Sequence, residues 1–375
     1  MEIEPVFQGD FVAAFLACDE KFLPYTVTAI ASIMENASPE TQYDIVVLTD
    51  AVPRDKTETA MSWFAKYSNG SLRFYDLGQE LAKIGRDNFH VTRRYPITVY
   101  FRFFSPSLFQ RYRRVLYLDS DIVAFRDIAA LFRTDLCGNA VGACHDTMYE
   151  EGFRAAWGTP AADYATNVLG LTPDDGYFNT GVLLMDLDRM RESSIMERAL
   201  DAMKHIDSPS LPDQDILNSV CKGDVLYLDG AWNLQDWVAD PLENSTKFHF
   251  ASQALREECR RTRNACGILH FSEKKPWGFE YAGSLEGCYW HYSAMTPFHD
   301  LTMGPWRWPG RAVTGARLLG VTAFHMFRCG FASVFGSAAN RQRNRRRLYD
   351  YRTRFSGLLG RLLRQRSTGI PSRMK

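Results

Sequence analysis

The sequence predicts an α/β protein in which helices cover a mostly parallel sheet. Apolar runs of strand length at residues 11–17, 43–48 and 72–77 alternate with helical patterns at residues 24–35 and 53–67. Such alternation is typical of parallel strands joined by helical crossovers. With 375 residues, 46% of them hydrophobic, the chain can bury the core of one large domain or two smaller ones.

The position of the acids agrees with this fold. Asp19, Asp50 and Asp119 each fall at the C-terminal end of a predicted strand. Ligands of open α/β sheets bind outside these strand ends. We therefore expect the functional site at this edge of the sheet.

The remaining elements follow with one polar interruption. Residues 79–94 are mixed in charge and lack a clean period, so we expect a mobile loop there that could serve as a lid. Strands are predicted at residues 115–123, 140–144, 177–186, 225–228 and 267–271, helices at residues 97–109, 128–132, 187–205 and from Pro212 onward, and a loop-rich segment at residues 150–172.

The segment VLYLDSDIV, residues 115–123, places Asp119 and Asp121 at the end of an apolar run. Residues i and i+2 of a strand share a face, so both carboxylates can converge while Ser120 turns away. Adjacent carboxylates repel unless a cation lies between them or one is protonated. Oxygen donors suit Mg²⁺ or Mn²⁺. An acidic turn that merely closes a strand is the alternative, and this motif alone leaves both open.

Two later segments carry further candidate residues. Asp213 and Gln214 fall in the first turn of the helix that Pro212 begins, where acids also serve as simple capping groups. His270 lies near a strand end, where a hydrogen-bonded structural role competes with metal ligation. Lys275 follows it in KKPW, and a cation at this place suits a bound diphosphate.

The eight cysteines include no Cys-x-x-Cys pair, and most lie in apolar, strand-like contexts. This pattern favours buried, reduced thiols over disulfides or a zinc site. The first ten residues, MEIEPVFQGD, contain acids where a signal peptide would carry Lys or Arg, and no apolar core follows. No export signal is therefore predicted there.

Six segments occur in the order and approximate spacing of glycosyltransferase family 8: ACDEKF, YFRF, YLDSDIV, YFNTGVLL, LPDQDILN and HFSEKKPW. The chain resembles in particular the bacterial lipopolysaccharide galactosyl- and glucosyltransferases, over roughly residues 11–280. The resemblance implies a GT-A fold with a mixed central sheet. It also implies transfer of galactose or glucose from a UDP-sugar, with retention of configuration, to a saccharide of lipopolysaccharide or another surface glycan.

The resemblance assigns roles to individual residues. Asp119, Asp121 and His270 match the ligands of Mn²⁺, or of Mg²⁺ in its place. Asp19 matches the acid that contacts the uracil or ribose, and Lys275 matches the lysine on the diphosphate, although the segment before it is one residue shorter than usual. The positions that match the donor-sugar pocket are Arg102, Asp146, Asn179, Gly181, Asp213 and Gln214.

Chemistry at such a site must stabilise a leaving diphosphate and a developing oxocarbenium ion. The metal and Lys275 would serve the first need, and Asp213 and Gln214 are the catalytic candidates for the second. A double displacement needs a carboxylate beneath the anomeric carbon. The resemblance implies that the family lacks a well-placed one, so we expect front-face transfer in which Gln214 only supports the transition state.

Two other functions compete with the transferase. A phosphatase or phosphotransferase would use Asp119 as nucleophile and Asp121 as acid, but it has no need of His270 followed by KKPW. A membrane-associated protein that binds UDP-sugars without turnover is the other.

The C-terminal segment differs in charge from the rest. Residues 301–375 contain 16 Lys and Arg but one acid, Asp350, whereas the first 300 residues contain 28 bases and 43 acids. Residues 318–335 are apolar, but His325 and Arg328 interrupt them, so they fall short of the roughly 18 to 20 residues of a spanning helix. We predict a catalytic domain at residues 1–300 and a basic amphipathic helical tail at residues 301–375.

The tail is expected to bind an anionic membrane surface. This would hold the protein on the cytoplasmic face of the membrane beside a lipid-linked acceptor. A solvated tail or a nucleic-acid-binding one is the alternative, although no nucleic-acid partner is predicted.

Overall fold

The computed structural model describes residues 2–92, 95–147, 149, 163–172, 174–206, 209, 211–236, 253–278, 281 and 285–303. The chain divides into two compact units. The first comprises Met1–Ala239, Ala251–Ser272 and Cys288–His299, and the second comprises Asp240–Phe250, Glu273–Gly287 and Asp300–Lys375. Every strand described below belongs to the first unit.

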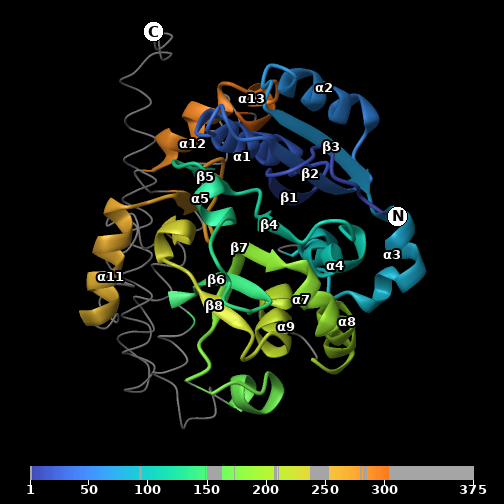
Figure 1. The fold of residues 1–375 in the computed structure, drawn as a ribbon, viewed down its shortest axis with the longest axis vertical. Helices are drawn as coiled ribbons and strands as arrows, with labels where there is room; N and C mark the ends of the chain where they lie inside the picture. The colour runs from blue at the N-terminus through green and yellow to red at the C-terminus, as the bar shows by residue number, and fades with distance from the viewer. Residues whose placement is uncertain are drawn as a thin grey trace, which may run out of the picture. The chain divides into compact units, whose positions relative to one another are not determined.

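The main sheet has seven strands in the order β3-β2-β1-β4-β7-β6-β8 (Figure 1). Strands β3, β2, β1 and β4 run parallel, β7 runs antiparallel to both of its neighbours, and β8 is parallel to β6. The bounds are β1 Val12–Asp19, β2 Tyr43–Asp50, β3 Gly70–Asp76, β4 Arg114–Leu118, β6 Val141–His145, β7 Phe178–Asp186 and β8 Val225–Tyr227. The predicted α/β class with a mixed sheet is confirmed.

A small second sheet has the order β5-β10-β9, formed by Ile122–Ala124, Ile268–His270 and Leu234–Gln235. Strand β5 follows β4 after a three-residue turn that contains both aspartates of the Asp-Ser-Asp motif. Residues 115–123 are therefore two short strands in different sheets, and the expectation of a single strand was wrong. The motif therefore forms the corner between the two sheets and does not simply end a strand.

The helices and turns of the first unit complete the fold. Figure 1 shows α1 and α2 near β1 to β3 and α7 and α9 near β7, with α8 packed beside α9. The helices are α1 Leu23–Glu35, α2 Arg54–Phe64, α3 Gly78–Ile84, α4 Ser105–Leu108, α5 Ala129–Phe132, α7 Leu187–Glu192, α8 Ile195–His205, α9 Pro212–Val220 and α11 Gln253–Asn264; the 3-10 helices are η1 Arg86–Asn88, η2 Ile97–Phe104 and η5 Gly230–Asn233; η4 Tyr164–Val168 is a π-helix. Helices α12 Glu286–Ser293 and α13 His299–Thr302 include residues of both units.

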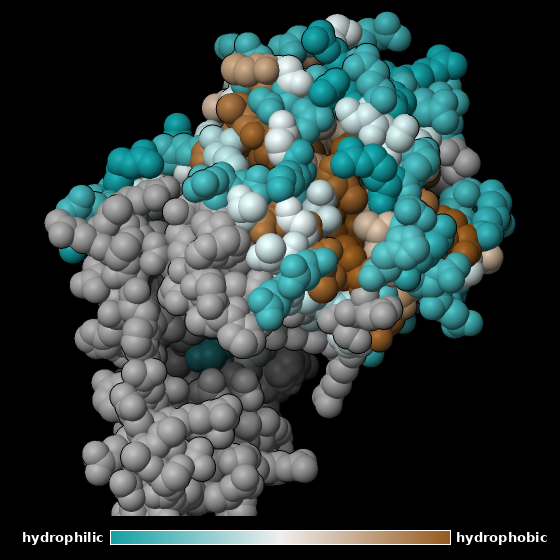
Figure 2. Space-filling view, turned by 90° about the horizontal axis from the view of Figure 1, so that it is seen from below, coloured by the Kyte–Doolittle hydropathy of each residue, from teal (hydrophilic) through white to brown (hydrophobic). Residues whose placement is uncertain are grey.

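The core lies on both faces of the parallel strands. Strand β2 is buried from Tyr43 to Leu48, and β1 is buried at all but two of its eight positions, as expected for strands with helices on both faces. Each fully buried Val, Leu, Ile or Phe side chain of these strands contributes about 1.5–3 kcal/mol of hydrophobic stabilisation. In the view of Figure 2, hydrophilic residues cover most of the described surface, with hydrophobic ones gathered near its middle.

Two further expectations about local structure differ from the fold. Residues 79–94 are not a loop throughout, because α3 and η1 occupy residues 78–88; α3 buries only Leu81, so its helical period was too weak to read. The helix expected at residues 187–205 is two helices, α7 and α8, separated by Ser193 and Ser194, and Ser194 is in the left-handed conformation (φ 50°). Residues 97–109 are helical as expected, but begin as the 3-10 helix η2.

Of the described free cysteines, Cys18, Cys144 and Cys221 are buried as predicted, whereas Cys137 is exposed and Cys266 and Cys288 are partly buried. Burial raises the pKa of the Cys18 and Cys221 thiols to about 12, so both are protonated and inert at neutral pH. Within the described ranges, no helix combines the length and the apolar character needed to span a membrane. Most of the predicted tail, from residue 304 onward, lies outside the described residues, and its domain assignment stays a prediction.

Candidate active site

Asp119, Asp121 and His270 converge where the two sheets meet. The Asp119 N–H donates to the carbonyl of Gly181 (2.8 Å), which extends the pairing of β4 with β7. Strand β10 pairs with β5 so that His270 lies opposite Ile122. The backbone thus places a histidine of one strand beside two aspartates of the turn between two others.

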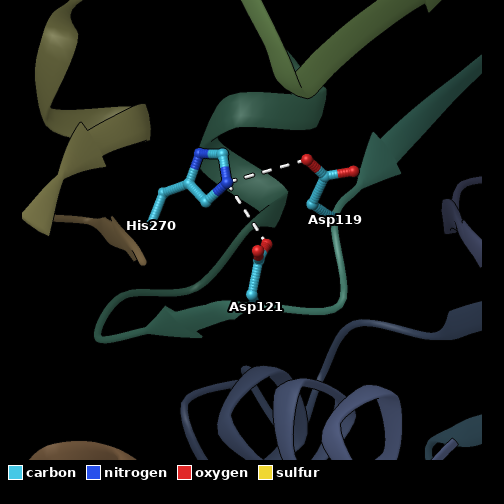
Figure 3. A group of neighbouring side chains, drawn as sticks. All are labelled: Asp119, Asp121 and His270. Atoms are coloured by element: carbon cyan, nitrogen blue, oxygen red, sulfur yellow. Dashed lines mark ion pairs between the residues drawn. The ribbon is translucent and has the colours of Figure 1, made fainter. Parts of the chain in front are cut away.

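The three side chains present their ligand atoms to one point (Figure 3). One atom of each lies within 4.8 Å of the others. His270 Nε2 lies 3.6 Å from Asp119 Oδ2 and 3.2 Å from Asp121 Oδ1. Two carboxylate oxygens and one imidazole nitrogen form a donor set that suits Mn²⁺ and also accepts Mg²⁺. Ser120 turns away as expected, and its Oγ lies 2.8 Å from Thr26 Oγ1.

Gly181 lies directly behind this group of ligands. A Cβ built on Gly181 would lie 2.7 Å from His270 Nδ1 and 2.9 Å from Asp119 Oδ2. Real Cβ contacts of that length are essentially absent. Gly181 therefore makes room for the ligand side chains, and the space that it leaves supports the fit of a metal ion there.

The Gly181→Ala variant is expected to bind Mn²⁺ about 10- to 100-fold more weakly, because the new methyl group displaces the His270 ring. Isothermal titration with Mn²⁺ measures this. Gly142→Ala is the matched control. Gly142 lies in β6, away from the ligands, and a Cβ built on it would lie 2.7 Å from Leu136 Cδ2. Equal Mn²⁺ affinity in Gly181→Ala and the wild type would contradict the conclusion that Gly181 makes room for the ligand side chains.

Arg102 is a buried cation that joins two of the candidate carboxylates. Its side chain is 3% exposed, and it lies 3.0 Å from both Asp119 Oδ1 and Asp213 Oδ2. It also donates to the carbonyls of Val99 and Thr180 and to the hydroxyl of Tyr117, so all five N–H groups have acceptors. Burial alone would lower the pKa of Arg102, but the attraction of Asp213 and Asp119 outweighs it and raises the pKa.

Arg102 therefore orients two carboxylates in this structure, and its predicted place in the donor-sugar pocket stays a prediction. Tyr117, which the sequence did not single out, donates to Asp119 Oδ1 (2.6 Å) and helps to hold it. These bonds occupy Oδ1 and leave Oδ2 facing His270.

Asp213 and Gln214 are buried at the start of α9. Asp213 accepts from Thr180 Oγ1 (2.9 Å) and pairs with Arg102, so it is not merely a cap. Burial raises the pKa of Asp213, and Arg102 opposes this rise. Gln214 is held at both ends: its Oε1 accepts from the Thr180 N–H (3.1 Å), and its Nε2 donates to Asp146 (3.0 Å). The structure thus links Asp213 to Asp119 through Arg102, and Gln214 to Asp146.

The other predicted residues have the following places. Asp146 and Asn179 are buried next to each other, with Asn179 Nδ2 donating to Asp146 Oδ2 (3.1 Å). Asp19 ends β1, and its Oδ1 accepts from the Phe22 N–H (2.9 Å), which opens the turn into α1. Lys275 belongs to the second unit, so its predicted contact with the diphosphate stays a prediction.

Two amides near the ligands escaped the sequence analysis. Asn233 accepts from His270 Nδ1 (2.8 Å), and Gln235 donates to Asp146 (3.4 Å). Both lie in an aromatic stretch that is remote in sequence from every motif. Only the pairing of β9 with β10 brings them to the site.

Comparison with known proteins assigns the family. The family model "Glycosyl transferase family 8" matches residues 13–280, which is more than half of the chain. The chain belongs to glycosyltransferase family 8. This establishes the predicted family and supports a transferase; it offers no support for the phosphatase alternative.

Relatives within glycosyltransferase family 8 share part of the chain. Glycosyltransferase GlyF of Streptococcus pneumoniae serotype 4 is 28% identical over 286 residues, which are 74% of this chain and 60% of GlyF. The lipopolysaccharide 1,2-glucosyltransferase of Escherichia coli K12 is 28% identical over 182 residues, 48% of either chain. The chain thus spans less than two thirds of the length of both relatives.

A solved structure supports the GT-A fold. The galactosyltransferase LgtC, in complex with donor and acceptor sugar analogs, superimposes with a TM-score of 0.61 at 24% sequence identity. The match covers 76% of this chain and 96% of LgtC. The similarity carries the fold, and the predicted GT-A architecture of this family 8 chain is confirmed.

Proposed function

We propose that this family 8 chain transfers galactose or glucose from a UDP-hexose to a saccharide acceptor, with retention of the anomeric configuration. The observation that carries the proposal is the convergence of Asp119, Asp121 and His270 within 4.8 Å in a glycosyltransferase fold. Mn²⁺ or Mg²⁺ is the proposed ion. The room that Gly181 leaves for the ligand side chains and the bonds that hold Asp119 in place support it.

A divalent ion bound there would act as a Lewis acid that offsets charge on a departing diphosphate. The chain's own residues prepare the place for it. Arg102 and Tyr117 hold one oxygen of Asp119, so the other stays directed at His270. Preorganised groups of this kind cost no reorganisation at the moment of reaction.

The pinned amide of Gln214 supports a front-face transfer. An amide is a poor nucleophile, and both ends of Gln214 already bond to protein groups. Asp213 Oδ2 in turn contacts both Arg102 and Thr180. We therefore propose that Gln214 and Asp213 stabilise the oxocarbenium-like transition state without forming a bond to the sugar.

The proposed route predicts that no glycosyl adduct forms on the protein. Incubation with a UDP-sugar and Mn²⁺, rapid acid quenching and peptide mass spectrometry should find unmodified Asp213 and Gln214. A hexosyl adduct on either residue that forms and decays at least as fast as turnover would overturn front-face transfer, because it would establish double displacement.

The nature of both substrates is proposed from relatives. LgtC is named a galactosyltransferase and the Escherichia coli relative a lipopolysaccharide 1,2-glucosyltransferase, which supports a UDP-galactose or UDP-glucose donor and an acceptor on lipopolysaccharide or another lipid-linked surface glycan. Asp19, Lys275 and the donor-pocket residues keep their proposed roles.

Release of UDP from a panel of UDP-sugars, with Mn²⁺ and with EDTA, tests the function. Slow hydrolysis of one donor that requires Mn²⁺ and is lost in Asp121→Asn is the expected result. Binding of a donor without release would favour the non-catalytic UDP-sugar-binding alternative. Neither binding nor release for any UDP-sugar would contradict the proposal.

We also propose that residues 301–375 attach the protein to the cytoplasmic face of a membrane, on the basis of their 16 basic residues. Each Lys or Arg near an anionic surface contributes about 1 kcal/mol. Truncation after residue 310 is expected to move the protein from the membrane fraction to the supernatant after low-salt lysis. Retention of the truncated protein on membranes would contradict this role.

A further inference from the structure

A line of side-chain hydrogen bonds runs away from the metal-binding group through His270. His270 Nδ1 lies 2.8 Å from Asn233 Oδ1, and Asn233 Nδ2 lies 2.9 Å from Asn179 Oδ1. Asn179 Nδ2 in turn lies 3.1 Å from Asp146 Oδ2. All four side chains are buried, with 3–6% of each residue exposed. Every polar contact along this line therefore has a large effect on the group next to it.

The direction of each hydrogen bond follows from the first unambiguous donor. The backbone N–H of Gly181 lies 2.9 Å from Asn179 Oδ1 and can only donate. Asn179 Oδ1 is therefore the oxygen, and the atom of Asn233 that faces it must be the NH₂ group. The opposite end of Asn179 then donates to Asp146, whose carboxylate only accepts here, as the geometry requires.

The same reasoning determines the state of His270. Since Asn233 presents its carbonyl oxygen to Nδ1, the ring must carry a proton on Nδ1. Nε2 is then the nitrogen that can offer a lone pair, and it faces Asp119 Oδ2 and Asp121 Oδ1. A metal ion binds the unprotonated nitrogen, and the partner of the other nitrogen decides which one that is.

We propose that Asn233 is a positioning residue that holds His270 in the tautomer able to bind the metal through Nε2. The amide of Asn233 is itself oriented by Asn179, which the Gly181 N–H and Asp146 hold from two sides. The inference rests on the metal centre of the proposed function. It adds a residue from η5 that bonds to His270 and acts on the metal only through that histidine.

Asp146 extends the same network toward the sugar site. Its Oδ2 accepts from Asn179 and also from Gln214 Nε2 (3.0 Å). One buried carboxylate thus anchors the amide line behind the metal ligand and the amide proposed to support the transition state. A change at Asn233 should weaken metal binding and leave the orientation of Gln214 intact, because Gln214 reaches Asp146 without passing through Asn233.

The test measures Mn²⁺ affinity by isothermal titration in the full-length protein. Asn233→Leu keeps the side-chain shape but removes the acceptor, so Nε2 can take the proton and bind a carboxylate in place of the metal. We expect binding to weaken about 10- to 100-fold, the usual effect of losing the partner of a ligating histidine. Asn233→Asp retains an acceptor for Nδ1–H and is expected to recover most of the affinity.

A spectroscopic signature separates tautomer control from general damage. In the Co²⁺-loaded wild type, the Nδ1 proton should give a hyperfine-shifted NMR signal that disappears in D₂O and is absent in His270→Ala. In Asn233→Leu this signal should exchange faster with water or be lost. Asn218→Leu is the matched control, because among the described residues the buried Asn218 amide bonds only to the backbone of Phe178 and Gln214. The Mn²⁺ affinity of this variant should not change.

The outcomes distinguish this inference from the function beneath it. Equal Mn²⁺ affinity of wild type and His270→Ala would overturn the metal centre itself. Normal metal binding by folded Asn233→Leu, with dependence on His270 retained, would overturn only the role of Asn233. If Asn233→Leu does not fold, the Mn²⁺ affinity of Asn233→Asp decides. Mn²⁺ binding by Asn233→Asp as weak as that by His270→Ala would overturn the role of Asn233, because an acceptor at position 233 would then not be enough to support the metal ligand.

Discussion

The Asp121→Asn variant is expected to lose nearly all metal-dependent transfer, with a fall in kcat of about 10²- to 10³-fold. The amide keeps the shape of the carboxylate but removes one negative charge from the group of three candidate ligands. Asp121 belongs to this group because its Oδ1 lies 3.2 Å from His270 Nε2. Mn²⁺ affinity should fall by at least about 100-fold. Titration with Mn²⁺ and release of UDP from the preferred donor measure the two effects.

Asp186→Asn is the matched control for this substitution. Asp186 ends β7 at the edge of the sheet opposite Gly181, and its carboxylate caps α7 by accepting from the Arg189 N–H (3.0 Å). Its loss should lower stability slightly and leave Mn²⁺ binding unchanged. Full metal-dependent turnover by Asp121→Asn would show that the convergence of the three side chains serves another purpose.

Replacement of Arg102 by Met is expected to give the largest loss of stability, about 3–5 kcal/mol in the free energy of unfolding. In the wild type, both Asp213 and Asp119 lie 3.0 Å from Arg102. The change removes this shared cation and leaves the two carboxylates without it. Urea denaturation at neutral pH measures the loss. Arg102→Lys should restore only part of it, because an ammonium lacks the planar fork that spans two carboxylates.

The loss should depend on pH in a defined direction. Burial already raises the pKa of Asp213 above its ordinary value while Arg102 opposes the rise, so removal of Arg102 raises it further. A group whose pKa is higher in the folded state stabilises the fold at pH values below its pKa in the unfolded chain. This stabilisation is lost as the pH rises through the pKa of the folded state. Arg102→Met should therefore be least destabilised in acid and most destabilised above the raised pKa.

Arg54→Met provides the contrast for Arg102. Arg54 pairs with Glu58 at 2.7 Å on the surface of α2, where its side chain is 91% exposed. Solvent screens such pairs, and their removal changes stability little. An equally small effect for Arg102→Met would mean that Asp119 and Asp213 tolerate burial without their cation.

Local patterns in the sequence were sufficient for much of the fold. The apolar runs of β1, β2 and β3 and the helical periods of α1 and α2 predicted these elements to within a few residues. For β1 and β2 this succeeds because strands buried on both faces read as continuous apolar segments. The exposed helix α3 failed for the opposite reason, since a helix that buries one residue carries almost no periodic signal.

The sequence by itself determined the family and the chemical types at the site: two aspartates separated by one residue, a histidine near a strand end, and an Asp-Gln pair opening a helix. These are local patterns, readable because their spacing is short. Only the tertiary structure decided that β5 leaves the main sheet and meets β10, which places His270 against Asp121.

The tertiary structure also decided the supporting partners of these groups. Arg102 reaches Asp213 across 111 positions of chain, and Asn233 reaches His270 across 37. No periodicity or spacing rule encodes such pairs, because they arise from strand order and register, which depend on long-range contacts. The sequence thus names the candidate ligands, and the fold selects the residues that orient their side chains.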